Sequence, residues 1–378
     1  MFSSRVPREL AANRLTIAVA AQRAAGCRPP IDLTASNPTQ AGFDYPHDLL
    51  APLADPRALA YAPAPFGMRS AREAVVRDYA RHGLEVPRDR IVLTASTSDA
   101  YSMLFKLLAD AGDEVLVPRP SYPLFDPLTR LDLVTPRPYD LDIHGGWAID
   151  VGSVERAITP RTRALLIVSP NNPTGSFVTR AEQDAIAAHR LPVISDEVFL
   201  DYPLDGVIST FVHDDVLTFT LGGLSKSAGL PHFKLAWIRV SGPGKREALD
   251  ALELIADNFL SVATPVQAAL PELLRIAPRI RNAIRARTRA NLQTLRNTMS
   301  RAPSVHVLPV EGGWSAVIRV PRVMPDEELA LALLDRGVLV QPGYFFDFAS
   351  DGYMVVSLLT AESVFAEGVR RIVDMVPA

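Results

Sequence analysis

Short apolar runs alternate with helix-like stretches between about residue 60 and residue 240 of the chain. Glycine, proline and polar residues bound the apolar runs, which is typical of buried strands. The predicted strands cover residues 91–95, 113–117, 164–169, 192–194 and 216–221. The predicted helices cover residues 68–82, which stop at Gly83, and 99–111. This alternation predicts an α/β layer in which a mostly parallel, wound sheet is flanked by helices.

Beyond residue 240 the pattern changes to longer helices followed by isolated strands. The predicted helices cover residues 245–258, 275–299 and 325–336, and the predicted strands cover 305–308, 315–320 and 353–359. A chain of 378 residues exceeds what one core usually supports. We therefore expect a second, smaller α+β domain in this part of the chain.

Polar side chains with complementary chemistry follow three of the predicted strands. Asn172 lies in an Asn-Pro-Thr-Gly segment after the first, Asp196 follows the second, and Lys226 follows the third. In an open α/β sheet, ligands bind beyond the carboxyl ends of the strands, so the three side chains are expected to converge. An amine can form a Schiff base with an aldehyde, a buried carboxylate can keep a pyridine nitrogen protonated, and an amide can donate to a ring oxygen.

Each of these segments also has a plain structural interpretation. A lysine in a loop is usually solvated, Asn-Pro-Thr-Gly alone is usually a turn, and an aspartate after a strand is often a helix cap. The three segments in this order favour a site for a pyridine-aldehyde cofactor over those separate interpretations.

The same segments resemble the fold-type-I pyridoxal-phosphate enzymes of the class I/II (aspartate/tyrosine) aminotransferase superfamily. The resemblance covers nearly the whole chain and implies pyridoxal 5'-phosphate as cofactor, with its Schiff base on Lys226. It also implies Asn172 at the ring hydroxyl and Asp196 at the pyridine nitrogen. It implies a large cofactor-binding α/β domain over residues 46–262 and a small α+β domain formed by residues 1–45 and 263–378.

Further segments fit the phosphate end and the ring face of such a site. Hydroxyls and free amides at a helix start can hold a phosphate, although a simple helix cap is an equally ordinary interpretation. The resemblance implies a stacking aromatic, a hydroxyl before the lysine, and a tyrosine that reaches the neighbouring subunit's cofactor, so a homodimer with shared active sites is expected. The residues in these positions are Ser96, Thr97, Ser98, Tyr122, Ser225 and Tyr61.

Departures from the family pattern identify a divergent member. Phe199 replaces a tyrosine that donates to the ring oxygen, and Lys234 replaces a phosphate-binding arginine. A lysine keeps the charge but loses the bidentate fork. Val355 stands where the family has the arginine that binds the substrate carboxylate. The residues expected on the substrate side are Asn37, Trp314, Tyr344 and Val355.

The composition of the chain indicates which kinds of binding partner, metal site and cellular location to expect. Hydrophobic residues make up 48% of the chain, charged residues 21%, and the net charge is −3, so neither nucleic acid nor a membrane is an expected partner. A single cysteine, Cys27, and scattered histidines predict no metal site. The chain has no apolar run long enough for a transmembrane helix and no signal-peptide pattern at its start, so a cytoplasmic location is expected.

The function that these observations favour is transamination between an amine or amino acid and a keto acid, with Lys226 as catalytic residue. A lyase, a decarboxylase or an amine-oxidising enzyme could use the same cofactor site, because reaction choice depends on which substrate bond is held perpendicular to the ring. A non-catalytic cofactor-binding scaffold is a remote alternative.

Overall fold

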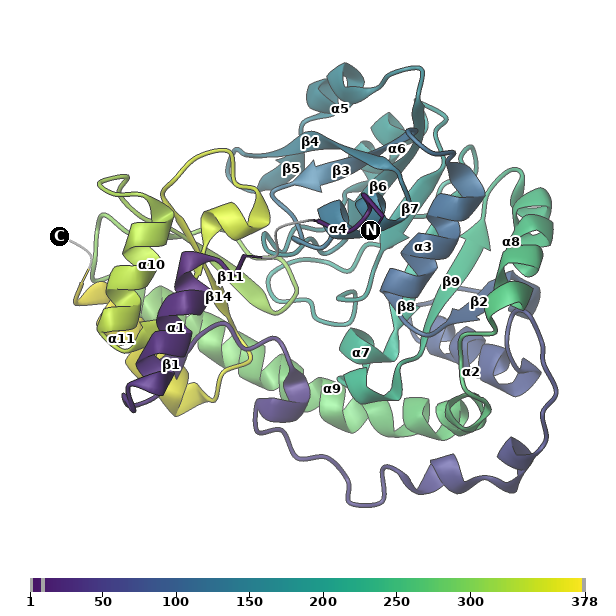
Figure 1. The fold of residues 1–378 in the computed structure, drawn as a ribbon, viewed down its shortest axis with the longest axis horizontal. Coiled ribbons are helices and arrows are strands. Elements are labelled where there is room, and N and C mark those ends of the chain that lie inside the picture. The colour runs from purple at the N-terminus through teal and green to yellow at the C-terminus, as the bar shows by residue number, and fades with distance from the viewer. Residues whose placement is uncertain (1–2, 8–10, 376–378) are drawn as a thin grey trace.

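An eight-stranded mixed sheet forms the centre of the large domain (Figure 1). The computed structural model describes residues 3–7 and 11–375. From one edge to the other the strands are β2 (Ile91–Thr94), β9 (Ala236–Ser241), β8 (Thr218–Gly223), β7 (Val193–Asp196), β6 (Thr162–Val168), β3 (Glu114–Arg119), β4 (Thr135–Ile143) and β5 (Trp147–Ile149). Only β9 and β5 run against the others in this sheet. The predicted α/β class with a mostly parallel sheet is confirmed.

Helices cover both faces of this sheet because its central strands are apolar on both sides. Along β6, Leu166 contacts the core on one face, whereas its neighbours Leu165 and Ile167 contact the core on the other. The first face is covered by α3 (Thr97–Leu108), α4 (Phe125–Leu131) and α8 (Lys245–Phe259). The second face is covered by α2 (Arg69–Ala80), α5 (Val151–Ala157) and α6 (Arg180–Ala187).

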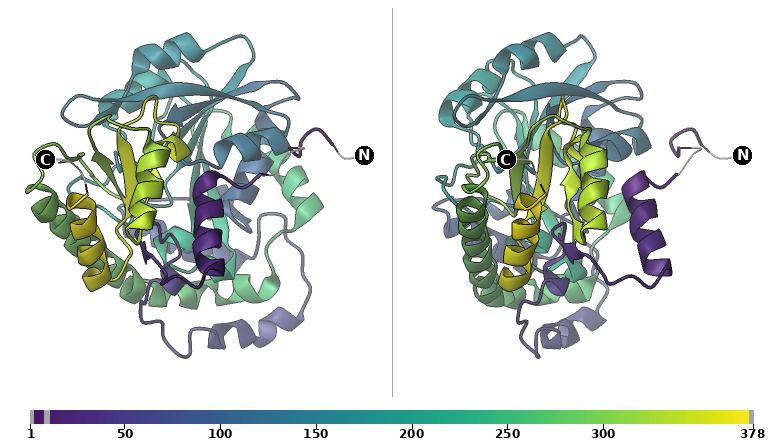
Figure 2. Two further views of the ribbon diagram at one scale, coloured as in Figure 1. Left: turned by 60° about the vertical axis from the view of Figure 1, so that its left-hand side comes forward. Right: turned by 90° about the vertical axis from the view of Figure 1, so that its left-hand side faces the viewer.

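The small domain is built on a four-stranded antiparallel sheet. Its strands are, in order, β10 (His306–Val307), β11 (Ser315–Arg319), β14 (Tyr353–Ser357) and β13 (Gln341–Pro342). A parallel pair, β1 (Ile31–Asp32) and β12 (Val338–Leu339), joins the N-terminal segment to this domain. Figure 2 shows α11 (Glu362–Val373) beside α9 (Thr264–Met299), and α1 (Arg14–Ala24) beside α10 (Asp326–Asp335).

Helix α9 is longer than the sequence predicted and belongs to both cores. Leu273 and Ile280 pack in the core beneath the large sheet, whereas Leu292 and Leu295 pack in the small-domain core. The predicted start at residue 275 was wrong, because the helix begins at Thr264. Proline normally disfavours a helix interior, and this helix contains Pro271 and Pro278. Burial of its apolar positions outweighs the two missing backbone hydrogen bonds.

The other predicted elements of the large domain correspond to observed strands and helices. The strands predicted between residues 91 and 221 are β2, β3, β6, β7 and β8, and the helices are α2 and α3. The elements that the sequence did not predict include β4, β5, β9, α4, α5 and α6 and, outside this domain, α1 and α11. Among the described helices, none combines the length and the apolar character that crossing a membrane requires.

Candidate active site

A cavity of about 400 Å³ opens where the carboxyl ends of β6, β7 and β8 face the small domain. The predicted residues that line it are Ser96, Thr97, Ser98, Tyr122, Asn172, Asp196, Phe199, Ser225, Lys226, Lys234 and Trp314. Their elements lie far apart in the sequence, and the parallel arrangement of the strands brings their ends to one edge. The predicted residues that do not line it are Tyr61, Asn37, Tyr344 and Val355.

Asp196 is the last residue of β7 and is buried at the base of the cavity. Its Oδ2 atom accepts a 2.7 Å hydrogen bond from the hydroxyl of Tyr101, and its Oδ1 atom accepts a 3.1 Å bond from the amide of Val198. Burial raises the pKa of Asp196 to about 6, and these hydrogen bonds oppose the rise. The carboxylate is therefore fixed in orientation and available to a cation presented from the cavity.

Lys226 lies in the short helix α7 (Leu224–Ser227), which follows β8 directly. Its Nζ atom donates a 3.4 Å hydrogen bond to the carbonyl oxygen of Ser36. The same atom lies 5.1 Å from the ring centroid of Trp314 and 5.7 Å from that of Phe199. Burial lowers the pKa of the Lys226 ammonium, although the Asp196 carboxylate opposes this. An amine that loses its proton more easily is a better nucleophile and proton acceptor near neutral pH.

The N-terminus of α3 forms one end of the cavity. Ser96 caps the helix by accepting a 3.1 Å hydrogen bond from the amide of Asp99, and Thr97 and Ser98 follow in the first turn. The amides at a helix start carry partial positive charge and bind anions well. Lys234, in the left-handed backbone region at φ +49°, adds a full positive charge to the cavity lining. This end of the cavity therefore suits a phosphate.

Aromatic and amide side chains line the space between the two ends. The amide oxygen of Asn172 accepts a 3.2 Å hydrogen bond from the hydroxyl of Ser315, which leaves its amide nitrogen to donate to a ligand. Tyr122 is 41% exposed and is another residue that lines the cavity. Phe199 and Trp314 meet edge to face with centroids 5.2 Å apart. Phe199 has no hydroxyl and therefore offers no side-chain donor at this wall, whereas the amide nitrogen of Asn172 does.

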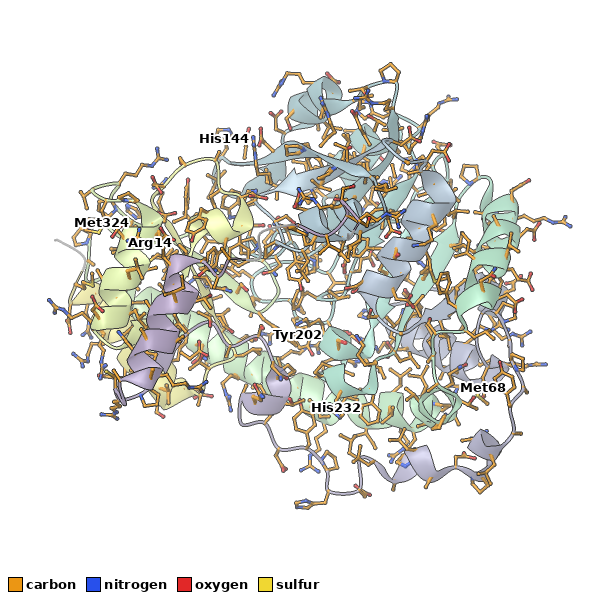
Figure 3. The ribbon with its side chains drawn as sticks, viewed as in Figure 1. Arg14, Met68, His144, Tyr202, His232 and Met324 are labelled. Atoms are coloured by element: carbon orange, nitrogen blue, oxygen red, sulfur yellow. The ribbon has the colours of Figure 1, made fainter. Side chains whose placement is uncertain are left out.

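Two buried side chains hold the backbone of the lysine turn from behind. The hydroxyl of Tyr202 donates to the carbonyl oxygen of Lys226 at 2.7 Å, and Arg281 Nε donates to that of Ser227 at 2.8 Å. Figure 3 places Tyr202 near the middle of the molecule. Arg281 also lies 3.4 Å from the carboxylate of Asp201, which compensates its buried charge. The position of Lys226 is thus set by contacts with α9 as well as with its own strand.

Two residues expected on the substrate side have other partners. The side chain of Asn37 accepts hydrogen bonds from the amide and the hydroxyl of Thr39, so it caps its own turn. The hydroxyl of Tyr344 donates to the carboxylate of Glu327 at 2.9 Å, and its side chain is 41% exposed. From the N-terminal segment, the cavity is lined instead by Ser36 and its two preceding residues.

Val355 lies on β14 behind the cavity wall. Its side chain is fully buried against Leu308, Val317 and Phe346, and Phe346 in turn lines the cavity. An uncharged cluster therefore fills the space behind this part of the wall. The small-domain residues that line the cavity are uncharged: Trp314, Ser315, Gln341, Phe346 and Ser357.

Tyr61 is 79% exposed and lies outside this chain's cavity. Other large apolar side chains are exposed as well, among them Leu59 at 91% and Phe259 at 58%. Removal of these side chains from water would be favourable.

Sequence reasoning missed Tyr101, Tyr202 and Arg281, which support the site without lining it. Each hydrogen bond connects residues far apart in the chain, the Tyr101–Asp196 pair by 95 positions. The one available signal was the place of Tyr101 on the helix whose first turn was expected to hold a phosphate.

Comparison with known proteins identifies the family. Residues 30–371 match the family described as aminotransferase class I and II. An alanine aminotransferase of Mycobacterium tuberculosis is 28% identical over 366 residues, which cover 90% of this chain and 84% of that protein. A tyrosine aminotransferase of Caenorhabditis elegans is 26% identical over 332 residues, covering 82% and 70%. A solved structure of a Thermus thermophilus aspartate aminotransferase double mutant is similar with a TM-score of 0.86, at 26% identity over 99% of both chains.

The chain belongs to the class I and II aminotransferase family. It is an aminotransferase of fold type I whose cofactor is pyridoxal 5'-phosphate.

Proposed function

We propose that Lys226 is the catalytic residue of this aminotransferase and that the cavity around it binds both the cofactor and the amino substrate. The main observation that supports this proposal is that one cavity is lined by Lys226, by the buried Asp196 carboxylate and by the start of α3. The substrates proposed are an amino acid or related amine and a keto acid. The relatives are named for alanine, tyrosine and aspartate, and this range supports the substrate class without selecting a member.

The donor set of the cavity fits the cofactor. Thr97, Ser98 and Lys234 would hold the phosphate, and Asn172 would donate to the ring oxygen. Each carboxylate oxygen of Asp196 already accepts a hydrogen bond, which fixes the orientation of the group. Its negative charge would pair with the protonated ring nitrogen. Tyr122 would cover the ring face. When bound, the cofactor supplies an electron sink for the carbon from which the substrate loses a proton.

Lys226 would perform two tasks in the cavity. Its Nζ atom would condense with the cofactor aldehyde, which releases water. Once the substrate amine has displaced it, Nζ would accept a proton from the α-carbon of the substrate and return it to the carbon of the cofactor to which the substrate nitrogen is joined. The lowered pKa of Lys226, caused by burial, supports the neutral amine that both tasks need. Trp314 and Phe199 exclude water from this side of the amine.

A homodimer is proposed as the active unit. The exposed side chains of Leu59, Tyr61 and Phe259 support it, because a second copy of the chain would remove them from water. Tyr61 would then reach the cofactor of the neighbouring subunit. A cytoplasmic location is also proposed, on the basis of one free, exposed cysteine and an ordinary soluble composition.

The test of the function is a product assay. Purified enzyme with pyridoxal phosphate is incubated with pairs of amines and keto acids, and mass spectrometry identifies the products. Transamination produces a new amino acid and a new keto compound in equal amounts. A product that has lost carbon dioxide, or ammonia released without an acceptor, would assign the chain to another reaction of this cofactor.

The affinity of the apoenzyme for pyridoxal phosphate is expected to fall as the pH falls through about 6. Burial raises the pKa of Asp196 to about 6 from the ordinary value of 3.8. The protonated acid therefore persists to a higher pH than in solution, and it does not pair with a cationic ring nitrogen. Fluorescence titrations between about pH 5 and about pH 7.5 check this expectation.

The matched control for this titration is Asp196→Asn, which cannot ionise. It is expected to bind the cofactor weakly at every pH and to lack the step near pH 6 that the wild type shows. A wild-type affinity that does not change over this range, or a step of the same size in the variant, would contradict the assignment to Asp196.

A further inference from the structure

Tyr101 lies behind Asp196 rather than in the cavity. Its hydroxyl donates a 2.7 Å hydrogen bond to Asp196 Oδ2, and its side chain is only 2% exposed. Tyr101 is not among the residues that line the cavity. An effect of this hydroxyl on a bound molecule must therefore pass through the carboxylate of Asp196.

The ring of Tyr101 is fixed by two aromatic neighbours. It stacks with Phe105 at a centroid distance of 6.0 Å and meets Phe125 edge to face at 5.7 Å. A side chain whose position is already set by packing loses little further freedom when it forms a hydrogen bond. The hydroxyl is therefore an oriented donor aimed at one carboxylate oxygen.

Tyr101 also connects the two ends of the cavity. It lies four residues after Thr97 on α3, so both side chains project from the same side of the helix. Thr97 belongs to the turn that suits a phosphate, and Tyr101 contacts the carboxylate at the other end. One rigid helix thus sets the separation between the two ends.

We propose that Tyr101 is a positioning residue that holds the Asp196 carboxylate, as the anion, against the ring nitrogen of the cofactor. This proposal rests on one part of the proposed function, namely that the ring nitrogen of the cofactor lies against Asp196. Removing the hydroxyl would leave Oδ2 buried without this donor, which disfavours the anion more than the neutral acid. The other charges that act on Asp196 are Glu197, which opposes ionisation, and Lys226, which favours it.

The test is Tyr101→Phe, which removes the hydroxyl and keeps the ring. The apoenzyme is titrated with pyridoxal phosphate and, separately, with the analogue in which a C–H replaces the ring nitrogen. The variant is expected to bind pyridoxal phosphate about tenfold more weakly than the wild type. It is expected to bind the analogue as the wild type does, because the analogue has no ring nitrogen for Asp196 to pair with.

Tyr139→Phe is the matched control. Tyr139 is equally buried and donates a 2.9 Å hydrogen bond to the carbonyl oxygen of Leu166, so its loss removes the same kind of bond. This variant is expected to keep wild-type affinity for both compounds. In the double variant with Asp196→Asn, the change at Tyr101 is expected to have no further effect on cofactor affinity.

Several outcomes would overturn the proposal. Equal weakening for both compounds would assign Tyr101 a merely structural role, and an unchanged affinity for pyridoxal phosphate would remove the role altogether. If Tyr101→Phe yields no folded apoenzyme, 3-fluorotyrosine is placed at position 101 instead, because its hydroxyl is a stronger donor and its shape is similar. This variant is expected to bind pyridoxal phosphate more tightly than the wild type and to bind the analogue equally well. An unchanged affinity for pyridoxal phosphate would overturn the proposal. A wild type that binds pyridoxal phosphate no better than the analogue would instead remove the proposed role of Asp196.

Discussion

Replacing Lys226 by alanine is expected to lower the rate of amino transfer by about 10³-fold or more. The variant would lose the amine that we propose attaches the cofactor and moves the proton, and a positioned base alone contributes about 10²–10⁴-fold. In the part of the chain that the structure describes, the Lys226 ammonium donates a long hydrogen bond to Ser36 and lies over the rings of Trp314 and Phe199, so the fold is expected to survive its removal. The product assay measures the loss, and circular dichroism checks the fold.

Lys245→Ala is the control for this prediction. Lys245 starts α8 and does not line the cavity, so the variant is expected to keep wild-type activity. In the wild type, borohydride reduction followed by peptide mapping should attach the cofactor to the peptide that contains Lys226. Attachment to another lysine, or an active Lys226→Ala variant, would contradict the proposed role.

The second large effect concerns recognition of the substrate carboxylate. The wild type is expected to show little preference for alanine over alaninamide in single turnovers followed by the cofactor absorbance. A charge-assisted hydrogen bond is worth about 1.5–3 kcal/mol, but position 355 carries a valine buried against Phe346. The side chains that line the small-domain side of the cavity there, Ser315, Gln341 and Ser357, are neutral.

Val355→Arg is expected to raise the preference for alanine over alaninamide by about 10- to 100-fold. Val355→Met is the control, since it adds a side chain of comparable length without charge and should leave the ratio unchanged. Arg119, one candidate for a replacement cation, is already paired with Asp140 at 2.6 Å. A wild type that strongly prefers alanine or turns over aspartate and glutamate rapidly would show that another cation, including one from a partner subunit, binds the carboxylate.

The sequence predicted the residues that line the cavity better than the residues that hold them in position. Asn172, Asp196 and Lys226 follow apolar strands directly, so local pattern and the rule for strand ends were sufficient to bring them together. Tyr101 reaches Asp196 from another helix, and no local pattern encodes that contact. Asn37 shows the converse, because its side chain forms short-range hydrogen bonds with Thr39 and does not line the cavity.

Prolines account for part of what the fold prediction missed. Strand β4 contains Pro136 and Pro138, which discourage a strand assignment. Because the two prolines are two positions apart, both backbone positions that lack an N–H face the same side of the strand. The strand still pairs with β3. The start of helix α9 was similarly obscured by Pro271, whereas Pro278 lies inside the stretch that the sequence did predict as helical. In both elements tertiary packing outweighs the local preference of the residue.

Because α9 contributes Leu273 to one core and Leu292 to the other, loss of the helix would remove apolar packing from both cores. Helix formation is cooperative, so the melting of one half exposes apolar positions and weakens the other half. Arg281 on this helix also holds the Ser227 carbonyl beside the lysine. The two domains are therefore expected to unfold together. A cavity created in the small-domain core lowers the population of molecules in which Lys226 is correctly placed, although the substitution lies far from the chemistry.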